Sequence, residues 1–324
     1  MNLFVLIPAL LVFFYGIALL YFQVAGHYKI IDQPNHRSSH SATTIRGGGI
    51  LFAIAGLLPF FVGDFRYFYF TGGLFLISLI SFLDDISSLN NKIRITVHLL
   101  SSVLLLIEWR MYDMPWYILP VIIVMIIGVI NAYNFMDGIN GITGLYSLVG
   151  ISTLLYINEL SFKFAESDLM IFLCLALMVF NFFNFRKQAK CFAGDVGSVS
   201  VAFIMVFLIG LLIMQTGSYG YLLFLLVYGL DAVTTIFFRV IRGENIAQPH
   251  RSHFYQYLAN EKRISHLLIS CLYGGLQLLV NVLVIKYSLM SIPAILVIVL
   301  LSALLFILLR WKIEGRDVLL KTKI

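Results

Sequence analysis

The chain has 324 residues, of which 60% are hydrophobic and only 12% are charged, and its mean hydropathy is +0.95. A soluble domain of this length cannot bury so much apolar surface, so the composition excludes one and indicates a polytopic membrane protein. The formal net charge of +6 would suit a nucleic-acid-binding protein, but its distribution along the chain points elsewhere.

Windows of about 17 to 22 apolar residues predict an all-α bundle of about eleven membrane-spanning helices. The first window, Leu3 to Phe22, lacks the basic start and cleavage site of a secretory signal, so we expect it to be a span. The predicted spans lie near residues 2–22, 48–63, 67–83, 95–110, 116–134, 139–157, 168–184, 198–215, 219–238, 266–286 and 291–309.

Basic residues are concentrated in alternate loops. Of the 22 Lys and Arg residues, only Arg66, Arg110, Lys163 and Lys286 fall in the second set of loops. The positive-inside rule therefore places the first set in the cytoplasm, with the N-terminus outside and the C-terminus inside. The positive charge is then largely topological, and nucleic acid is excluded as a partner.

The polar clusters also fall in the basic loops. We see no internal repeat and no separate soluble domain, so we interpret residues 1–324 as one membrane-embedded domain. Its predicted active-site loops are residues 23–47, 84–94, 135–141, 185–198 and 239–265.

The first of these loops contains Arg37 and Arg46, and Gly47, Gly48 and Gly49 precede the second span. Three glycines allow the backbone to approach a ligand closely, and a helix N-terminus favours an anion. Guanidinium groups suit phosphate oxygens. The pattern favours phosphate binding, although an ordinary basic loop with a flexible helix start would look the same.

Asp84 and Asp85 follow an apolar run, and Lys92 and Arg94 come shortly after them. Carboxylates at the edge of a membrane are costly, and acids at a helix C-terminus oppose the helix dipole. Neighbouring helical side chains point about 100° apart. The pair could therefore divide work between a metal and a substrate, or raise one another's pKa toward that of a general base.

Asn131, Asn134 and Asp137 follow one another at i+3 spacing, which places them on one face of a helix. Further along the chain, Asp195 stands in a Gly-Asp-x-Gly-Ser segment at the start of a span. There its carboxylate could bind Mg²⁺ together with substrate phosphates. A helix N-cap is the structural alternative for Asp195.

The last basic loop carries His250, Arg251 and His253. Two histidines at i, i+3 could bind zinc, but no third ligand of a suitable type is close in sequence. Phosphate recognition agrees better with the other basic loops. Asp231, inside the ninth predicted span, has no assigned role.

These clusters together offer carboxylates for one divalent metal and a base, cations for phosphates, and a position at the lipid interface. Metal-assisted phosphoryl transfer between a cytosolic phosphate-rich donor and a membrane-held acceptor needs this combination. A transporter or flippase is the rival class. It is disfavoured because transporter sites usually lie near the bilayer midplane, often between repeated halves.

The five motifs, in this order, resemble those of the polyprenyl-phosphate N-acetylhexosamine-1-phosphate transferase family. The resemblance implies a bundle of ten or eleven helices in the bacterial inner membrane, with its catalytic cleft facing the cytoplasm. It also implies Mg²⁺ (with Mn²⁺ as an alternative), a UDP-N-acetylamino sugar as donor, undecaprenyl phosphate as acceptor and UMP as a product. The oligomeric state, including a homodimer, stays open.

Carried over by motif, the resemblance implies catalytic roles for Asp84, Asp85 and Asp137, and a magnesium-binding role for Asp195. Asp84 is favoured as the base toward the lipid phosphate. Asn184, which precedes the Gly-Asp motif, is expected near the uridine. The loop that carries His250, Arg251 and His253, called the histidine loop below, is expected near the pyrophosphate. The substrate-binding set, from the motifs and the basic loops, is Arg37, Arg46, Lys92, Arg94, Asn131, Asn134, Asn184, His250, Arg251 and His253.

Two departures from the family pattern bear on specificity. Asn140 replaces the second aspartate of the usual Asp-Gly-x-Asp-Gly, and the last loop reads His-Arg-Ser-His. Both variants resemble the branch that initiates lipopolysaccharide O-antigen with UDP-N-acetyl-fucosamine or UDP-N-acetyl-quinovosamine. UDP-N-acetylglucosamine, in the service of another cell-envelope glycan, is the alternative donor.

Overall fold

The computed structural model describes residues 3–33, 43–63, 65–246, 248, 250–287 and 291–321. Two short strands and two 3-10 helices accompany its α-helices: β1 (Ile31–Asp32), β2 (Thr44–Ile45), η1 (Met111–Asp113) and η2 (Tyr219–Leu225). The α-helices are α1 (Leu3–His27), α2 (Ile50–Val62), α3 (Phe68–Ile86), α4 (Asn91–Glu108), α5 (Leu119–Met136), α6 (Ile142–Leu160), α7 (Ser167–Asn184), α8 (Gly194–Thr216), α9 (Leu226–Ile241), α10 (Phe254–Asn260), α11 (His266–Lys286), α12 (Ile292–Glu314) and α13 (Arg316–Leu320).

The all-α fold predicted from composition is confirmed. Each of the eleven predicted segments is helical, although the segment 219–238 begins as the 3-10 helix η2. Within the described ranges, eight helical segments are long and apolar enough to cross a membrane, and α2 is a shorter apolar helix. The number of spans and the sides of the two termini stay predictions. Helices α10 and α13 were not predicted, since each is shorter than a hydropathy window.

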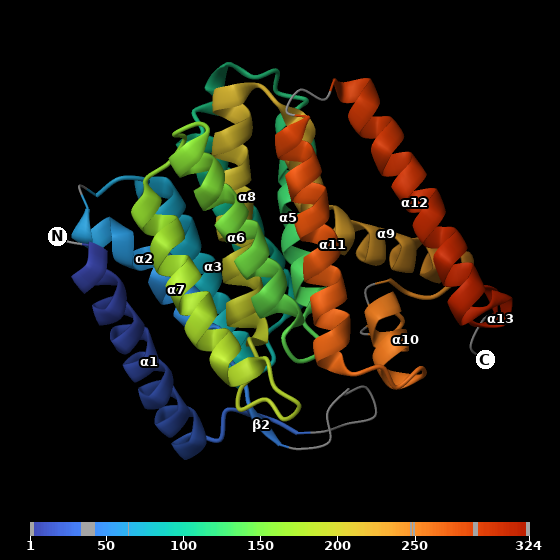
Figure 1. The fold of residues 1–324 in the computed structure, drawn as a ribbon, viewed down its shortest axis with the longest axis horizontal. Helices are drawn as coiled ribbons and strands as arrows, with labels where there is room; N and C mark the ends of the chain where they lie inside the picture. Colours follow the sequence, from blue (N-terminus) through green and yellow to red (C-terminus); the bar gives the residue numbers. More distant parts are fainter. Residues whose placement is uncertain are drawn as a thin grey trace.

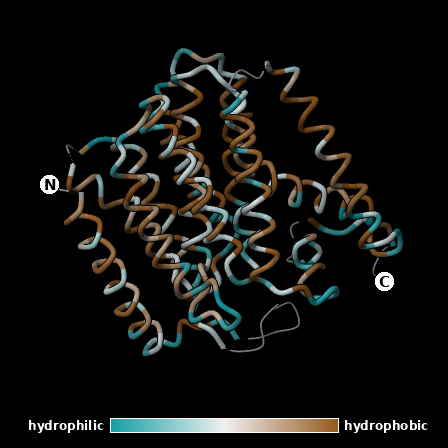
Figure 2. Tube along the Cα trace, in the orientation of Figure 1, coloured by the Kyte–Doolittle hydropathy of each residue, from teal (hydrophilic) through white to brown (hydrophobic). Residues whose placement is uncertain are grey.

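Helix α8 is at the centre of the bundle. Of its most apolar 18-residue window, 83% is buried, against 6% for α12. It packs against α2, α3, α5 and α6, while α12 contacts α9, α13 and η2 at the edge of the molecule (Figure 1). Figure 2 shows hydrophobic residues along most of α12 and hydrophilic residues gathered mainly at the helix ends.

Helix α9 runs across the direction of α5, α8 and α11 instead of alongside them (Figure 1). It leads toward the lower end of α12, where α10 and α13 also lie. Polar residues in α9 can therefore contact both the histidine loop and the C-terminal helices.

The loops that carry most of the predicted site meet at one end of the bundle. β1 pairs with β2 in antiparallel register, and Ile45 of β2 forms a parallel bridge with Cys191. The first loop is thereby attached to the segment that leads into α8, beside the lower ends of α1 and α7 (Figure 1).

Candidate active site

Asp85, on the last turn of α3, caps the start of α8. Its Oδ1 accepts a hydrogen bond from the backbone N–H of Asp195 (2.9 Å), and its Oδ2 accepts one from that of Val196 (3.0 Å). The first N–H groups of a helix have no partner within the helix, and a negative charge there interacts favourably with the helix dipole. Asp85 is buried and fixes the backbone position of Asp195.

Two arginines join three carboxylates into what we call the acid–arginine cluster. Arg46 Nε donates to Asp85 Oδ1 at 2.7 Å, and Arg46 Nη2 lies 3.1 Å from Asp195 Oδ1. Arg94 lies 3.0 Å from Asp84 Oδ2 and 3.1 Å from Asp195 Oδ2. The Arg46 and Arg94 side chains are 35% and 25% exposed. Three carboxylates against two guanidinium groups leave the cluster with one net negative charge, and its cations remain accessible.

Asp84 and Asp85 serve different partners, as their helical offset predicts. Asp84 Oδ1 accepts a hydrogen bond from the backbone N–H of Leu89 at 2.7 Å, and its Oδ2 faces Arg94. Asp85 is instead directed at the N-terminus of α8. The Asp84 side chain is 8% exposed, whereas that of Asp85 is fully buried.

Asp137 lies on the turn just beyond α5, which ends at Met136. Asp137 is the C-cap residue of α5, so the helix ends one residue earlier than the spacing of Asn131, Asn134 and Asp137 assumes. Burial, with the nearby charges of the Asp195 and Asp85 carboxylates, raises the pKa of Asp137 to about 7. Asp137 is therefore close enough to the acid–arginine cluster for the charges of Asp85 and Asp195 to act on it.

The two asparagines of α5 are half-buried. Asn134 Oδ1 accepts a hydrogen bond from Ser198 Oγ of α8 at 3.1 Å. This contact holds the end of α5 against the start of α8, next to Asp195. Asn131 lies about one turn earlier on the same helix.

The glycines of the first loop do not form an open phosphate cradle, which corrects the prediction. Gly48 N–H and Gly49 N–H donate to the carbonyls of Phe192 and Ala193 at 2.8 and 3.0 Å. A Cβ on Gly49 would collide with the Cα of Gly197. The glycines are needed because two backbone segments approach each other, and this contact places Arg46 beside Asp195.

Asn184, at the end of α7, holds two turns together. Its Oδ1 accepts from the Gly141 N–H and its Nδ2 donates to the Cys191 carbonyl, both at 2.7 Å. Asn140 Nδ2 donates to the carbonyls of Arg186 and Lys187 at 2.8 and 3.2 Å. Both amides are buried, so in this structure Asn184 is occupied by the protein and not directed at an open nucleotide site.

The histidine loop packs against the turn that carries Asp137. The hydroxyl of Tyr255 donates to the carbonyl of Phe135 at 2.9 Å. The rings of His250 and His253 lie with their centroids 4.9 Å apart, and each contacts the Phe135 ring. Burial, and then the neighbouring His253, lower the pKa of His250 to about 3. His250 is therefore neutral at neutral pH and would not supply the positive charge expected of it.

The remaining predicted cations differ in position. Arg251 is partly exposed and pairs with Glu261 at 3.7 Å. Lys92 is exposed on the first turn of α4, and it is Arg94 that reaches the carboxylates. Arg37 lies outside the described residues.

The carboxylates suit a magnesium ion that takes most of its ligands from substrate and water. Asp195 and its neighbours offer oxygen donors, which Mg²⁺ prefers, and proteins commonly bind it through one or two carboxylates plus phosphate oxygens. Over the described part of the chain, no group of three or more His, Cys, Asp or Glu side chains is arranged to hold a metal unaided. Asp195 is the residue that would hold the ion.

Sequence reasoning missed Arg310 and left Asp231 without a role. Arg310, counted as a cytoplasmic basic residue, is buried on α12 and pairs with Glu314. An Arg and a Glu four residues apart at the end of an apolar helix was the available signal. Asp231 is also buried, and it accepts hydrogen bonds from the histidine loop.

A membrane-embedded helix bundle with clustered carboxylates and accessible arginines at one end has the groups of a phosphoryl-transfer enzyme. Residues 67–214 match the model of glycosyl transferase family 4. The chain is also 27% identical, over 257 residues, to a probable undecaprenyl-phosphate N-acetylglucosaminyl 1-phosphate transferase of Bacillus subtilis (strain 168); the match covers 73% of this chain and 71% of that protein.

Both comparisons show that the chain is similar to the polyprenyl-phosphate sugar-phosphate transferases. It is a multi-pass membrane protein and a transferase. The matched segment runs from α3 to α8 and contains Asp84, Asp85, Asp137 and Asp195. Arg46 and the histidine loop lie outside it.

Proposed function

We propose that this protein transfers an N-acetylamino-sugar 1-phosphate from a UDP-sugar to undecaprenyl phosphate, releasing UMP. The observation that carries the proposal is the convergence of Asp84, Asp195, Arg46 and Arg94 at one end of the bundle. Phosphoryl transfer depends mainly on positioning and on electrostatic stabilisation of phosphate oxygens. Partly exposed guanidinium groups, held in place by nearly buried carboxylates, supply both.

Arg46 and Arg94 bind the diphosphate of the donor in this proposal. Each already bridges two carboxylates, so phosphate oxygens can replace one partner while the other holds the guanidinium in place. Asp195 holds Mg²⁺, which when bound would neutralise charge on the diphosphate. Exchange of carboxylate for phosphate partners keeps each arginine paired throughout.

Asp84 acts as the base toward the acceptor. A phosphate monoester loses its second proton near pH 6, so at neutral pH only a fraction of the acceptor still carries a proton for Asp84 to remove. Asp85 keeps the start of α8 in position. Asp137, whose pKa is about 7, can donate a hydrogen bond to a phosphate oxygen of the donor when protonated.

UDP-N-acetylglucosamine is the first donor to test, because the Bacillus relative carries that sugar in its name. The His-Arg-Ser-His loop favours UDP-N-acetyl-fucosamine or UDP-N-acetyl-quinovosamine, and with them an O-antigen role, as the second candidate. Asn140 in place of aspartate favours none of these donors. Its side chain donates to two carbonyls, which an ionised aspartate could not do, so the substitution is explained by the turn.

The basic loops support a cytoplasmic active site in a bacterial inner membrane, where UDP-sugars are available. The test is to incubate membranes containing the protein with undecaprenyl phosphate and a panel of labelled UDP-sugars. Acceptor-dependent release of UMP supports the proposal, and the preferred sugar identifies the branch. If label enters the lipid without UMP release, or no UDP-sugar reacts in Mg²⁺ or Mn²⁺, the proposal is wrong.

The same preparation separates two routes. In one, the lipid phosphate attacks the donor directly; in the other, an aspartate first forms a covalent intermediate. We propose the direct route. Exchange of labelled UMP into UDP-sugar without acceptor would contradict it.

A further inference from the structure

Asp231 accepts hydrogen bonds at both oxygens from the start of α10. The backbone N–H groups of Phe254 and Tyr255 donate to Oδ1 and Oδ2 at 2.9 and 3.1 Å. The hydroxyl of Tyr273 adds a bond to Oδ2 at 2.6 Å. A buried carboxyl group surrounded by donors is stabilised in its ionised form. Asp231 is thus a buried anion beside the histidine loop.

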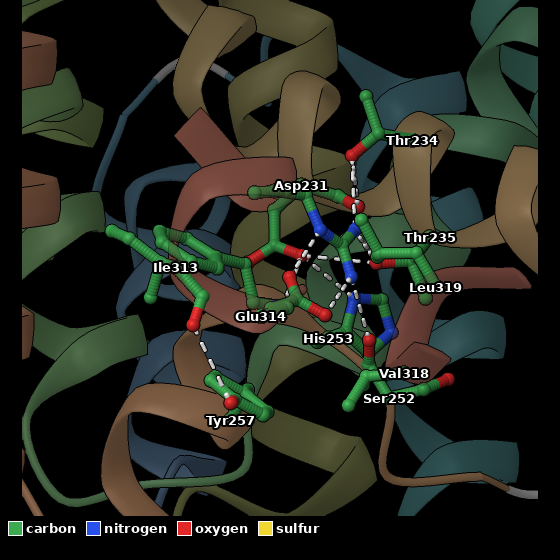
Figure 3. A network of polar contacts seen from close by, with 12 residues as sticks. Asp231, Thr234, Thr235, Ser252, His253, Tyr257, Ile313, Glu314, Val318 and Leu319 are labelled. Atoms are coloured by element: carbon green, nitrogen blue, oxygen red, sulfur yellow. Dashed lines mark hydrogen bonds and ion pairs between the residues drawn. The ribbon is translucent and has the colours of Figure 1, made fainter. Parts of the chain in front are cut away.

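The ring of His253 faces this anion. Its Nδ1 lies 3.2 Å from Asp231 Oδ1 (Figure 3). An ionised carboxylate can only accept, so Nδ1 must carry the proton that joins the two groups. The His253 ring is held in one orientation by this bond and by the adjacent ring of His250.

The other nitrogen of His253, Nε2, is directed away from Asp231. It is buried and has no hydrogen-bond partner among the described residues. The ring also contacts Phe135, two residues before Asp137. Nε2 is therefore a polar atom with unused bonding capacity, on a ring packed against the turn that carries Asp137.

Arg310 attaches this arrangement to α12. Its guanidinium donates to the Ser252 carbonyl at 3.0 Å and to Thr235 Oγ1 at 2.8 Å. It also pairs with Glu314 at 2.5 Å. Arg310 thus joins α12 to α9 and to the residue that precedes His253.

We infer that Asp231 is a positioning residue for His253: it holds the ring by the proton on Nδ1 and directs Nε2 toward the substrate phosphates, where Nε2, when it also carries a proton, donates a hydrogen bond to a phosphate oxygen. Arg310 holds the loop against α9 from the other side. The inference rests on the proposed function for the identity of the substrate, but the state of the His253 ring does not depend on it.

The first experiment reads the ring directly, in the unmodified protein. In protein labelled with ¹⁵N-histidine, long-range ¹H–¹⁵N correlations distinguish a ring protonated at Nδ1 from one protonated only at Nε2. The chain has seven histidines, and the signal lost in His253→Gln identifies the relevant ring. We expect a protonated Nδ1, and a shift of Nε2 on addition of UMP. A ring with no proton on Nδ1 overturns the inference, even if the protein proves to be the expected transferase.

The second experiment is a double-mutant cycle on kcat/KM for UMP release. Asp231→Asn should lower kcat/KM by about 10- to 100-fold, as loss of an orienting partner typically does. In a His253→Gln background the same change should cost less than about 2-fold, because the residue acts through the histidine. An equal loss in both backgrounds would assign Asp231 a purely structural role.

Asp317→Asn is the matched control, because it makes the same chemical change on the neighbouring helix α13. The Asp317 side chain is 74% exposed, so we expect kcat/KM to stay within 2-fold. If the unmodified protein transfers no sugar phosphate at all, the proposed function fails, and the NMR measurement alone decides the role of Asp231.

Discussion

The acid–arginine cluster and the network around Asp231 use the same side chains in opposite ways. Arg46 and Arg94 are about a third and a quarter exposed, whereas Arg310 is 1% exposed. In the first cluster each arginine bridges carboxylates at a partly open surface. In the second, Arg310 is surrounded by two threonine hydroxyls, a carbonyl and Glu314.

The difference in exposure indicates that the two regions have different roles. A partly exposed ion pair contributes little to stability, so exchanging one of its partners for a substrate phosphate costs little. A buried pair resists exchange, because removing one partner leaves an uncompensated charge in a low-dielectric environment. We therefore expect the arginines of the acid–arginine cluster to respond to substitution mainly in activity, and Arg310 mainly in stability.

Asp195→Asn should have the largest effect on activity. Loss of the carboxylate removes the proposed Mg²⁺ ligand and a partner of both cluster arginines, so we expect kcat to fall by about 1000-fold. The Tm in detergent should change little. Asp168→Asn, at the opposite end of the bundle, is the control. Full Mg²⁺-dependent activity in Asp195→Asn would remove this residue from the site.

Asp84→Asn and Asp85→Asn should separate two neighbours that sequence alone treats as equivalent. Asp84→Asn should reduce kcat by about 100-fold with little change in Tm. Asp85→Asn replaces an acceptor of two backbone N–H groups, so it should also lower the free energy of unfolding by about 1–3 kcal/mol. Equal Tm values for the two variants would contradict the assigned division of roles.

Arg310→Gln tests the buried network around Asp231. It leaves Glu314 buried without its cation, and we expect a loss of about 3–5 kcal/mol in stability. The double variant Arg310→Gln/Glu314→Gln should recover much of that loss. Arg94→Gln is the comparison from the open cluster: its stability should fall by less than about 1 kcal/mol while its activity falls. A larger loss of stability in Arg94→Gln than in Arg310→Gln would contradict the distinction between the two regions.

The sequence predicted the helices well because each is a long apolar segment, and hydropathy depends on local composition. It also predicted that Asp84, Asp137 and Asp195 lie at or next to helix ends. It could not predict that Asp85 caps α8, since that contact joins residues more than 100 positions apart. Motif matching treats every polar residue in a loop as available to substrate. The structure instead uses Asn184 and three glycines to hold the loops together.

The role of Arg310 was hidden for a related reason. Positive-inside counting treats every Lys or Arg near a helix end as a solvated topological charge. Burial of Arg310 follows from the crossing of α9 beneath α12, which is a tertiary feature (Figure 1). The four-residue spacing of Arg310 and Glu314 indicates that they can pair, but it does not specify the crossing that buries them.

Gly49→Ala tests the backbone contact that places Arg46. The new methyl group would collide with Gly197 and crowd Ala193, so we expect a loss of about 1–3 kcal/mol in stability. Activity should fall as well, because Arg46 moves with the loop. Gly16→Ala is a matched control, since nothing lies within 4 Å of its added Cβ, and alanine should favour helix α1 slightly. Equal Tm values for Gly49→Ala and the unmodified protein would exclude a tight contact.

Asp137→Asn should raise stability by a small amount that grows with pH. The pKa of Asp137 is raised from 3.8 to about 7 in the folded protein. Between these values the folded state binds more protons than the unfolded state, so this residue makes folding less favourable as pH rises from about 4 to 7. Asparagine does not ionise. The variant should therefore match the unmodified protein near pH 3.8, gain on it as pH rises to about 7, and exceed it by about 1 kcal/mol at pH 8, after allowance for solvent screening.

A substitution that stabilises the fold while lowering transferase activity is typical of a carboxylate retained for function. Tm values of the two proteins at pH 5, 6, 7 and 8, together with UMP release at pH 8, provide the test. A constant Tm difference across this range would mean that Asp137 does not titrate there. Asp137 would then have a structural role only, and it would not act together with the acid–arginine cluster.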